Sequence, residues 1–380
     1  MRTPTPAGPD LARTRAWATV DLDAIEHNLR AIRGVIPRAT ALMAVVKADA
    51  YGHGAVAVAR AAMAAGATWL GVATAEEALE LRGAVQSGHI LILGPVPEQW
   101  IEPLAAADCA FTIGDRTSAA IVQRAASRPR VHIKIDTGMT RIGTAPEDLG
   151  DLLSDLNPAR VAVEGVYTHF ACADDSASPM TAAQLAAFAR AAESVRKRFP
   201  QAIRHAASSA AALAFPDAAL DMVRIGIAMY GAPPMPRTPI PLRPAMTLGA
   251  RVVRTRRVPA GTPVSYGATY RAKAETTIAT VALGYGDGYP RALSGAGRML
   301  VGGKPVPVAG RVCMDFTMLD AGDTPVHEGD DVIAFGEGLP AAEVAEAGGS
   351  ISYELFCRVG RRVPRVYTRG GRAVELARIP

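Results

Sequence analysis

Cysteine and histidine are scarce in this sequence, and neither residue forms a cluster. The chain of 380 residues has four cysteines and seven histidines. Cys109, Cys172, Cys313 and Cys357 lack the close pair spacing of a zinc site or a disulfide framework. We therefore expect unpaired thiols in a reducing compartment, the cytoplasm, and no bound metal.

Long apolar runs and a signal segment are also missing. No stretch is long and apolar enough to span a bilayer. The first residues, MRTPTPAGPDLARTR, lack the apolar core of a secretory signal. We expect residues 1–16 to form a flexible tail, and we expect no membrane partner.

The charges are mixed and scattered along the chain. Lysine and arginine number 41 against 36 acidic residues, which gives a net charge of +5 at pH 7. The nearest thing to a basic cluster is RVVRTRRV (251–258), which alternates as a strand does. We interpret it as a solvated strand face, and we expect no nucleic-acid partner. Hydrophobic residues make up 49% of the sequence, which indicates a sizeable core, and the length suits two domains.

From residue 41 the sequence alternates between short β-rich runs and longer, alanine-rich amphipathic stretches. The predicted strands are 41–47, 68–74, 89–94, 109–113, 131–136, 163–170, 203–208 and 222–231. Helical periodicity marks 55–66, 75–86, 98–107, 117–127, 147–156 and 181–199. Such alternation predicts βαβ units and a parallel sheet. Eight strands favour a (β/α)8 TIM-like barrel, with a doubly wound open sheet as the alternative.

Two further segments flank this alternating region. Residues 17–33 are typical of a short strand followed by a helix, with the N-cap at Asp21 or Asp23. Residues 231–244 are proline-rich and typical of a linker, and β-like segments separated by turn residues follow them. We predict a barrel domain over 17–243, whose leading strand can pack on the second domain, and a mainly β C-terminal domain over 244–380.

Basic side chains are predicted at the C-terminal ends of the barrel strands, where barrels of this kind carry their active sites. Lys47 is expected to end the first strand. Lys134 and Arg141 lie in or just after the fifth strand, His169 closes the sixth, and Arg224 lies in the eighth. A mouth with so many cations and few acids implies an anionic ligand.

The segments after the seventh and eighth strands carry small residues suited to phosphate binding through backbone N–H groups. They include Ser208, Ser209, Gly226 and Ile227. A lysine desolvated at a strand end has a lowered pKa and is a good imine-forming nucleophile. Such a lysine beside a phosphate site is what pyridoxal 5′-phosphate (PLP) chemistry requires. For Lys47 alone, a snorkelling or ion-paired structural lysine is the alternative.

Eight motifs carry a family resemblance. They are AVVKADAYGHG (44–54), DTGMTRIG (136–143), THFA (168–171), VRIGIAMYG (223–231), VSYGATY (264–270), GYGDGYPR (284–291), GRVCMDF (310–316) and YELFCRVGRRVPRVY (353–367). In this order and spacing the sequence resembles the alanine racemases, which are two-domain, PLP-dependent enzymes of fold-type III. The resemblance implies interconversion of L- and D-alanine, a supply of D-alanine for peptidoglycan, and a homodimer with shared active sites.

The resemblance also implies two bases on opposite faces of the substrate α-carbon. Lys47 would hold PLP covalently and serve one face. Tyr266 would serve the other face, from the partner subunit. Arg141 would hydrogen-bond Tyr266 and the substrate carboxylate, and Met314 would offer its backbone to that carboxylate. A racemase must remove a proton from one side and deliver one to the other, so two bases suit the reaction.

Further positions match residues that bind the cofactor in this family. The positions that match the phosphate-binding residues are Tyr51, Ser209, Gly226 and Ile227. Arg224 matches the residue that faces the pyridine nitrogen. Since an arginine does not give up its proton, that nitrogen would stay unprotonated, which discourages transamination. His169 matches a neighbour that positions this arginine.

Three positions match residues around the substrate pocket. Lys134 matches a lysine that is carbamylated in many family members; a plain lysine would repel Arg141, whereas a carbamate would pair with it. Tyr285 and Tyr353 match aromatic gate residues contributed in trans, which favour a small side chain such as methyl. His53 is expected to shape the turn that follows Lys47 rather than to act chemically.

Two positions depart from the family pattern. Ser208 stands where asparagine commonly precedes the phosphate-binding serine, so the local support of the phosphate is expected to differ. Thr140 stands where glycine is frequent, so the loop before Arg141 is expected to differ slightly.

Three other functions are weighed against an alanine racemase. A racemase acting on serine, lysine or arginine would need a wider gate than Tyr285 and Tyr353 leave. A decarboxylase of the same fold would remove a carboxylate rather than bind it with Arg141, and need not carry Tyr266. A PLP-homeostasis protein without turnover would resemble the barrel alone.

Overall fold

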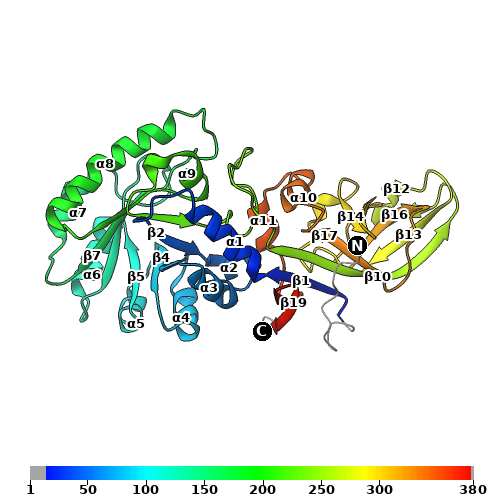
Figure 1. Ribbon diagram of the computed structural model, residues 1–380, viewed down its shortest axis with the longest axis horizontal. Coiled ribbons are helices and arrows are strands. Elements are labelled where there is room, and N and C mark those ends of the chain that lie inside the picture. Colours follow the sequence, from blue (N-terminus) through cyan, green and yellow to red (C-terminus); the bar gives the residue numbers. More distant parts are fainter. Residues whose placement is uncertain (1–13, 378–380) are drawn as a thin grey trace.

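Eight parallel strands of the N-terminal half curve around a common axis (Figure 1). They are β2 (Ala41–Val45), β3 (Trp69–Val72), β4 (His89–Pro95), β5 (Cys109–Ile113), β6 (Arg130–Lys134), β7 (Ala162–Tyr167), β8 (Ile203–His205) and β9 (Met222–Ile225). From β2 to β8 each strand pairs with the next, and β9 pairs with β2. The computed structural model describes residues 14–377.

The ring of strands closes between β8 and β9. The backbone N–H of Asp221 donates to the carbonyl oxygen of Arg204 at 3.1 Å, and that of Arg224 donates to Ala207 at 2.9 Å. The side chains of Arg204 and Asp221 add an ion pair of 2.9 Å. These contacts complete a barrel, so the predicted (β/α)8 fold is confirmed and the open doubly wound sheet is excluded.

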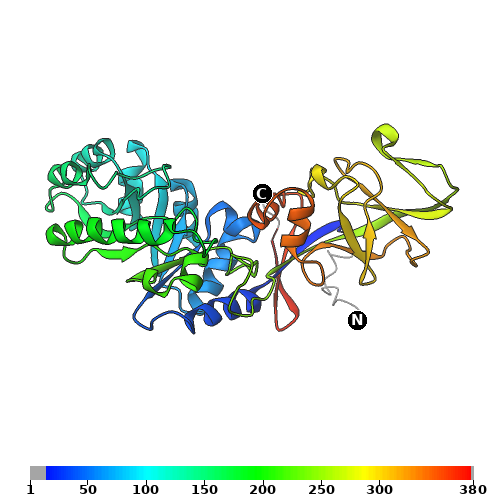
Figure 2. The same ribbon diagram turned by 90° about the horizontal axis from the view of Figure 1, so that it is seen from above.

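Helices cover the outside of the barrel, as Figure 2 shows from above. They are α1 (Leu22–Arg33), α3 (Ala55–Ala64), α4 (Ala75–Ala84), α5 (Ile101–Ala106), α6 (Arg116–Arg124), α7 (Leu149–Asp155), α8 (Met180–Arg198) and α9 (Ser209–Ala214). All six predicted helical stretches between the strands are present. The N-cap of α1 is Asp21, whose carboxylate accepts hydrogen bonds from the backbone N–H groups of Asp23 and Ala24.

Six barrel strands end at least two residues earlier than the apolar runs predict, and four of them lead into the rim of a cavity. The last strand residues of these four are Val45, Tyr167, His205 and Ile225. Within about two residues of these ends the chain leaves the hydrogen-bonded ladder and turns over the C-terminal rim, where Lys47, His169 and Ser208 line a cavity. The apolar and small residues beyond the strand ends are therefore buried at the rim without being part of a strand. Sequence periodicity cannot distinguish such residues from strand residues, because both are buried.

Side chains fill the barrel interior in layers, as is usual for this fold. A lower, apolar layer lies toward the N-terminal ends of the strands and consists of Met43, Trp69, Leu91, Ala110 and Met222. Above it lie buried polar side chains from β5, β6, β8 and β9, namely Thr112, His132, Lys134, His205 and Arg224. The polarity of the interior therefore rises toward the rim at which the cavity opens.

The C-terminal part of the chain forms a mainly β body beside the barrel, as predicted (Figure 1). Its nine-stranded sheet contains β1 (Ala16–Asp21), β10 (Met246–Val258), β13 (Thr276–Val281), β14 (Arg298–Val301), β15 (Lys304–Pro307), β16 (Thr317–Gly322), β17 (Asp331–Phe335), β18 (Arg365–Arg369) and β19 (Arg372–Ala377). A small hairpin of β11 (Pro263–Val264) and β12 (Tyr270–Arg271) projects from it.

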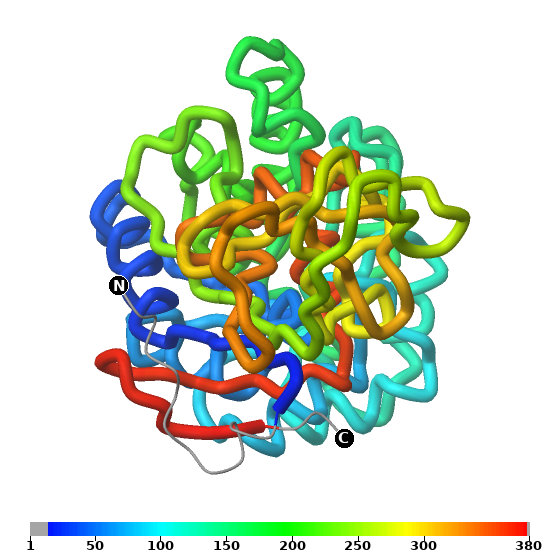
Figure 3. The backbone as a smooth tube through the Cα atoms, turned by 90° about the vertical axis from the view of Figure 1, so that its right-hand side faces the viewer, coloured from blue at the N-terminus to red at the C-terminus, as the bar shows by residue number. Residues whose placement is uncertain are grey.

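The first strand of the chain belongs to this second sheet. β1 pairs antiparallel with β10 and parallel with β18, so the two ends of the chain run side by side (Figure 3). The basic segment 251–258 lies on β10, and two of its exposed arginines pair with acids, Arg254 with Glu328 and Arg257 with Glu275. The predicted solvated strand is therefore present.

Two short helices that the sequence analysis did not predict follow β17. They are α10 (Ala341–Ala347) and α11 (Ser352–Cys357). α11 lies at the seam between the two bodies and packs against the segment that follows β2 (Figure 1). The C-terminal body therefore contributes to the rim of the barrel of its own chain.

Residues 1–13 of the expected tail lie outside the described residues. Arg15, which was also assigned to the tail, forms an ion pair of 2.5 Å with the buried Asp287, and Ala16 opens β1, so both belong to the fold. No helix in residues 14–377 combines the length and the apolar character needed to cross a membrane.

Candidate active site

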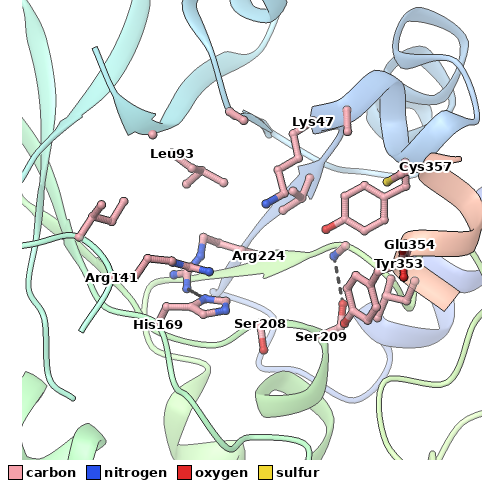
Figure 4. Close-up of a pocket in the computed structure, with 18 of the residues that line it drawn as sticks. Lys47, Leu93, Arg141, His169, Ser208, Ser209, Arg224, Tyr353, Glu354 and Cys357 are labelled. Carbon is pink, nitrogen blue, oxygen red and sulfur yellow. Dashed lines mark hydrogen bonds between the residues drawn. The ribbon is translucent and has the colours of Figure 1, made fainter. Parts of the chain in front are cut away.

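A cavity of about 780 Å³ opens at the C-terminal ends of the barrel strands, against α11 (Figure 4). Its volume is in the range of small-molecule sites. The predicted site residues that line it are Lys47, Tyr51, Lys134, Arg141, His169, Ser209, Arg224, Gly226, Ile227 and Tyr353, together with Ser208. Tyr266, Tyr285 and Met314 do not line it.

Lys47 follows the first barrel strand rather than ending it. β2 ends at Val45, and Lys47 is the first residue of a single turn, α2 (Lys47–Gly52). The next four residues, Ala48 to Tyr51, have φ of 52–53° and ψ of 44–50°, which is the left-handed helical region. This conformation costs an L-residue roughly 1–2 kcal/mol, so other contacts must compensate for it.

Two carboxylates bind the backbone of this left-handed turn. Glu77 accepts from the N–H of Ala48 at 2.7 Å and, through its other oxygen, from the N–H of Ala73 at 2.7 Å. Asp49 accepts from the N–H of Ala55 at the start of α3, also at 2.7 Å. The turn is thereby attached to both neighbouring segments. Asp49 and Glu77 were not singled out from the sequence.

The C-terminal segment packs against the other side of the turn. The Nε of Arg365 donates to the carbonyl oxygen of Gly52 at 2.9 Å. Gly52 and Gly54 have positive φ, and a Cβ on either would overlap the carbonyl of Phe356 or the hydroxyl of Tyr367. Glycine is therefore required at both positions for the C-terminal segment to approach.

His53 lies behind the turn, away from the cavity. Its Nδ1 is 2.9 Å from the carbonyl oxygen of Tyr51. Burial lowers its pKa to about 3, so the ring is neutral. This arrangement agrees with the expectation that His53 shapes the turn.

The side chain of Lys47 points into the cavity (Figure 4). Burial lowers the pKa of its amine, and the positive charge of Arg141 lowers it further, while Glu77 and Cys357 act in the opposite direction. A larger fraction of the amine is therefore neutral than in water, as a nucleophile requires. The desolvation expected from the sequence is present.

A small polar cradle lies at the opposite end of the cavity from the barrel interior. The ring of Tyr51 is held between Tyr230 and Tyr353, with centroids 4.8 and 5.8 Å away. Ser209 accepts from the N–H of Gly226 at 3.0 Å. A Cβ on Gly226 would lie 2.7 Å from the Tyr51 hydroxyl, so only glycine leaves this cradle open.

Arg224 lies on the barrel side of the cavity and is buried. Its hydrogen bonds within the described residues come from the two terminal nitrogens. Nη1 donates to the carbonyl oxygen and Nδ1 of His205, and Nη2 donates to the carbonyls of Thr168 and Ala206 and to Nδ1 of His169. Nε–H is left for a ligand in the cavity. Burial lowers the pKa of Arg224 to about 10, so it remains a cation at neutral pH.

His169 meets Arg224 as the sequence analysis expected. The distance between Arg224 Nη2 and His169 Nδ1 is 3.2 Å. Burial and then the charge of Arg224 lower the pKa of His169 to about 2. The ring is therefore neutral and accepts a hydrogen bond from the arginine.

Lys134 is a second buried lysine at the cavity. Its Nζ lies over the ring of Tyr167, 4.9 Å from the centroid. Burial lowers its pKa to about 7, and the charges of Arg224 and Arg141 contribute to the shift. A substantial fraction of Lys134 is therefore a neutral amine at neutral pH, whereas an ordinary lysine is almost fully charged.

Arg141 stands on a loop that one carboxylate organises. Asp136 accepts hydrogen bonds from the backbone N–H groups of Gly138, Met139, Thr140 and Arg141. Burial opposes ionisation of Asp136, but these four donors outweigh it and hold its pKa below the usual range. Thr140 has φ of 55°, a conformation that glycine adopts more readily.

Three predicted residues lie on the second body, away from this chain's cavity. Tyr266, Tyr285 and Met314 are 71%, 43% and 53% exposed. Their segments are neighbours, since the N–H of Tyr285 donates to the carbonyl of Cys313, and Ser265 donates to the carbonyl of Arg311. They therefore form one exposed surface, which we call the β-domain face.

Tyr353 was expected to reach the cavity of the partner subunit. This expectation is wrong, because Tyr353 lies beside the cavity of its own chain. α11 places Tyr353 at the rim of the same chain's barrel, with its ring against Tyr51. Although 41% of Tyr353 is exposed, partial desolvation of its hydroxyl raises its pKa to about 12, so the phenol is neutral. The sequence could not distinguish the two cases because α11 was not predicted.

Several residues of the site were missed from the sequence. They are Asp49, Glu77, Tyr167, His205 and Cys357. Tyr167 and His205 end their strands, where the two-residue period of side chains marks inward positions, so this period could have indicated them. Glu77 could have been suspected from the capping box that it forms with Thr74.

The chain matches two family descriptions. Alanine racemase, N-terminal domain, matches residues 20–234, and alanine racemase, C-terminal domain, matches residues 245–367. Among curated proteins, the alanine racemase of Desulfosudis oleivorans is 43% identical over 93% of this chain and 97% of its own length. That of Thermobifida fusca is 45% identical over 93% of this chain and 98% of its own length.

Solved structures agree with these matches. The chain is similar to the alanine racemase of Bacillus anthracis with bound L-Ala-P, with a TM-score of 0.89 and 40% identity over 96% of this chain and 98% of that chain. It is also similar to the enzyme of Streptomyces lavendulae, with a TM-score of 0.87 and 41% identity over 94% and 98% of the two chains. The chain therefore belongs to the alanine racemase family, whose members are isomerases.

Proposed function

We propose that this chain binds PLP in the cavity of Figure 4 and racemises alanine with Lys47 and Tyr266 as the two bases. The observation that carries the proposal is the arrangement around one cavity of a desolvated lysine and a buried arginine whose Nε–H is available. A lysine with a purely structural role would require neither a cavity at its amine nor an arginine with a free N–H at the same cavity.

The residues present fit PLP. The cradle offers the hydroxyl groups of Tyr51 and Ser209 and the backbone N–H of Ile227 to a phosphate, and a Cβ at Gly226 would fill it. Arg224 would donate from Nε to the pyridine nitrogen, and its two terminal nitrogens are already held by the barrel. Lys47 would supply the neutral amine that holds the cofactor through its aldehyde.

PLP supplies an electron-withdrawing ring that acidifies the α C–H bond of an amino acid bound to it. Lys47 then moves a proton to or from the α-carbon on one face, and Tyr266 of the partner subunit does so on the other. Arg141 pairs with the substrate carboxylate, and the backbone of Met314 hydrogen-bonds it. Tyr353 and Tyr285 narrow the approach to the pocket, which favours the methyl side chain of alanine.

We propose a homodimer because the cavity of a single chain is not lined by the second base, Tyr266. Tyr266 is 71% exposed and does not line its own cavity, so it can serve only the cavity of another copy. The exposed Ile351 and Tyr353 beside the cavity offer an apolar surface that the β-domain face of a second copy can cover. A two-fold axis would form two such contacts at once.

Two further parts of the proposal rest on the same site. Lys134 is a candidate for carbamylation, because a partly neutral amine can react with carbon dioxide and the resulting carbamate would pair with Arg141. The D-alanine formed would supply peptidoglycan synthesis from the cytoplasm. The first part is supported by the chemistry of Lys134 and Arg141, and the second by family membership.

The proposal is tested by following the optical activity of D-alanine solutions with the purified PLP-loaded protein. L-alanine should form with the native chain and not with Lys47→Ala, which should also lack the yellow absorbance of bound PLP. Lys197→Ala, at an exposed lysine on α8, is the matched control and should behave as the native chain. Formation of L-alanine by Lys47→Ala would refute the assignment. Serine, lysine and arginine as substrates test the breadth of the pocket.

A further inference from the structure

Two histidines lie end to end inside the barrel, beneath the cavity, and the function proposed above gives neither of them a role. His132 on β6 and His205 on β8 are both fully buried. The Nδ1 of His132 is 2.8 Å from the Nε2 of His205. The other ring nitrogen of His205, Nδ1, is 3.1 Å from Nη1 of Arg224. The three side chains form a continuous line from the barrel interior to the cavity.

The chemistry of arginine fixes the direction of every hydrogen bond in this line. A guanidinium group only donates, so Nδ1 of His205 accepts from Arg224. A neutral His205 then carries its proton on Nε2, which donates to Nδ1 of His132. His132 must carry its own proton on Nε2. Burial lowers the pKa of His132 to about 3 and that of His205 well below its usual value, so both rings are neutral.

The far end of the line has no acceptor. Nε2 of His132 is buried and lacks a hydrogen-bond partner among residues 14–377. Its ring packs edge-on against Trp69, with centroids 5.2 Å apart at 70°. An unpartnered buried N–H costs about 1–3 kcal/mol, which an apolar side chain of similar size would avoid. The barrel tolerates this cost at one nitrogen of His132 while keeping an acceptor at the other.

The surrounding residues hold both rings in place. A Cβ on Gly165 of β7 would overlap the ring of His132, so glycine at this position makes room for the ring. Tyr167 stacks on His205, with centroids 4.7 Å apart and ring planes within 8°. The hydroxyl of Tyr167 is fixed in turn by Thr112, 2.8 Å away. The rings therefore cannot turn freely to exchange donors and acceptors.

We propose that His132 is a positioning residue for Arg224. By accepting the Nε2–H of His205, His132 leaves Nδ1 of His205 as a fixed acceptor for the guanidinium. Arg224 is then held with its Nε–H toward the cavity. The inference deepens the proposed function and rests on it for the last step, in which that Nε–H meets the pyridine nitrogen of PLP.

Two substitutions distinguish the hydrogen-bond acceptor of His132 from the space that its side chain fills. In His132→Asn, the amide oxygen can replace Nδ1 as an acceptor for His205. In His132→Leu, the space is filled without an acceptor, so Nε2–H of His205 loses its partner and the ring is driven to leave Arg224. His327→Leu, at an exposed histidine, is the matched control.

The first measurement is nitrogen-15 NMR of the histidine side chains in the protein without PLP. The native chain and His132→Asn should show His205 with its proton on Nε2. A proton on Nδ1 of His205 in the native chain would overturn the inference. This measurement needs no turnover, so it stands if the chain proves not to racemise alanine, and it decides the matter if His132→Leu does not fold.

The second measurement is the ratio of pyruvate release to racemisation in the PLP-loaded enzyme. Pyruvate leaves when the amino group of alanine remains on the cofactor, and a pyridine nitrogen without a fixed donor can be protonated, which favours this outcome. The ratio should rise about tenfold in His132→Leu, as expected for loss of one buried hydrogen bond, and stay at the native value in His132→Asn. A folded His132→Leu enzyme with the native ratio would contradict the inference, since a general loss of structure lowers both rates together.

Discussion

Arg365 donates a hydrogen bond from its Nε to the carbonyl oxygen of Gly52, across 313 residues of sequence, with an N–O distance of 2.9 Å. The same buried guanidinium donates to the carbonyls of Val359, Gly360 and Val363. One side chain thus joins the C-terminal strand, the loop that precedes it and the turn that carries Lys47. The second body of the chain therefore contributes to holding the turn that carries Lys47.

Replacing Arg365 by lysine should disturb this turn although the charge is kept. An ammonium group cannot reach four carbonyls that a planar guanidinium reaches together. We expect a loss of about 2–4 kcal/mol in the free energy of unfolding and weaker PLP binding, measured by denaturant titration and by absorbance. Arg372→Lys on β19, at an exposed position, should change neither quantity. Native PLP affinity in Arg365→Lys would show that the turn holds without the C-terminal segment.

Subunit mixing should reveal whether Tyr266 acts in trans. Lys47→Ala and Tyr266→Phe should each be inactive alone. A mixed dimer would contain one site with native Lys47 and native Tyr266, and one site that lacks both. Random exchange at equal amounts gives mixed dimers in half of the population, so about a quarter of native racemase activity should return.

The control for subunit mixing is each variant exchanged with itself under the same conditions, which should restore nothing. Exchange is checked by mass spectrometry of differently tagged chains. If mixed dimers form but activity does not return, either both bases of a site come from the same chain or Tyr266 is not one of the bases.

Adding a methyl group at Gly226 should weaken cofactor binding. The new Cβ would lie 2.7 Å from the hydroxyl of Tyr51, whose ring cannot retreat because Tyr230 and Tyr353 hold it. We expect Gly226→Ala to raise the dissociation constant for PLP at least about tenfold, a change worth about 1.4 kcal/mol, measured by absorbance titration.

Gly83→Ala is the matched control for this substitution. Gly83 is on α4, and a Cβ there meets no atom within 4 Å. This variant should bind PLP normally and be stabler by up to about 1 kcal/mol, since alanine favours a helix over glycine. Equal PLP affinity in the two variants would mean that the cradle at Gly226 does not hold the phosphate.

Stability should depend on pH through Lys134. Its pKa is about 7 in the folded protein, against about 10.4 in an unfolded chain. Between these values the unfolded chain holds a proton that the folded chain lacks, so the contribution of Lys134 to the unfolding free energy rises with pH from about 7 to about 10. Below pH 7 the group destabilises the fold by its full amount.

Lys134→Met should remove this dependence. In PLP-free protein and bicarbonate-free buffer, the variant should be several kcal/mol stabler than the native chain near pH 6, and the difference should vanish near pH 10. Urea unfolding at a series of pH values measures it. Lys197→Met, which removes an exposed lysine, should follow the native curve at every pH. A difference that does not vary with pH would mean that packing, and not charge, accounts for the change.

The barrel could be predicted because its strands and helices alternate in separate local patterns. The second half of the long strand β10 was also predicted, since residues 251–258 alternate as a strand does. Short elements without periodicity were missed. α11 has six residues, too few for a helical period to be read, and it is the element that brings Tyr353 to the cavity.

The conformation around Lys47 could not be predicted for a different reason. Ala48 and Ala50 favour right-handed helix by their own propensity, yet both have positive φ. The contacts that impose this conformation come from Glu77 and Arg365, which are distant in sequence. Local preference was therefore overruled by tertiary contacts, and a pattern read along one stretch contains no information about them.

The left-handed turn has a consequence for the order of events during synthesis. Four strained residues in succession cost roughly 4–8 kcal/mol in all, and the compensating contacts come from Glu77 and Asp49 within the barrel and from Arg365 on the second body. Arg365 leaves the ribosome 313 residues after Gly52, when the barrel sequence has long been complete. We therefore expect the turn that carries Lys47 to be held less firmly in a nascent barrel, and to reach its final rigidity only when the second body has been synthesised and has packed against it.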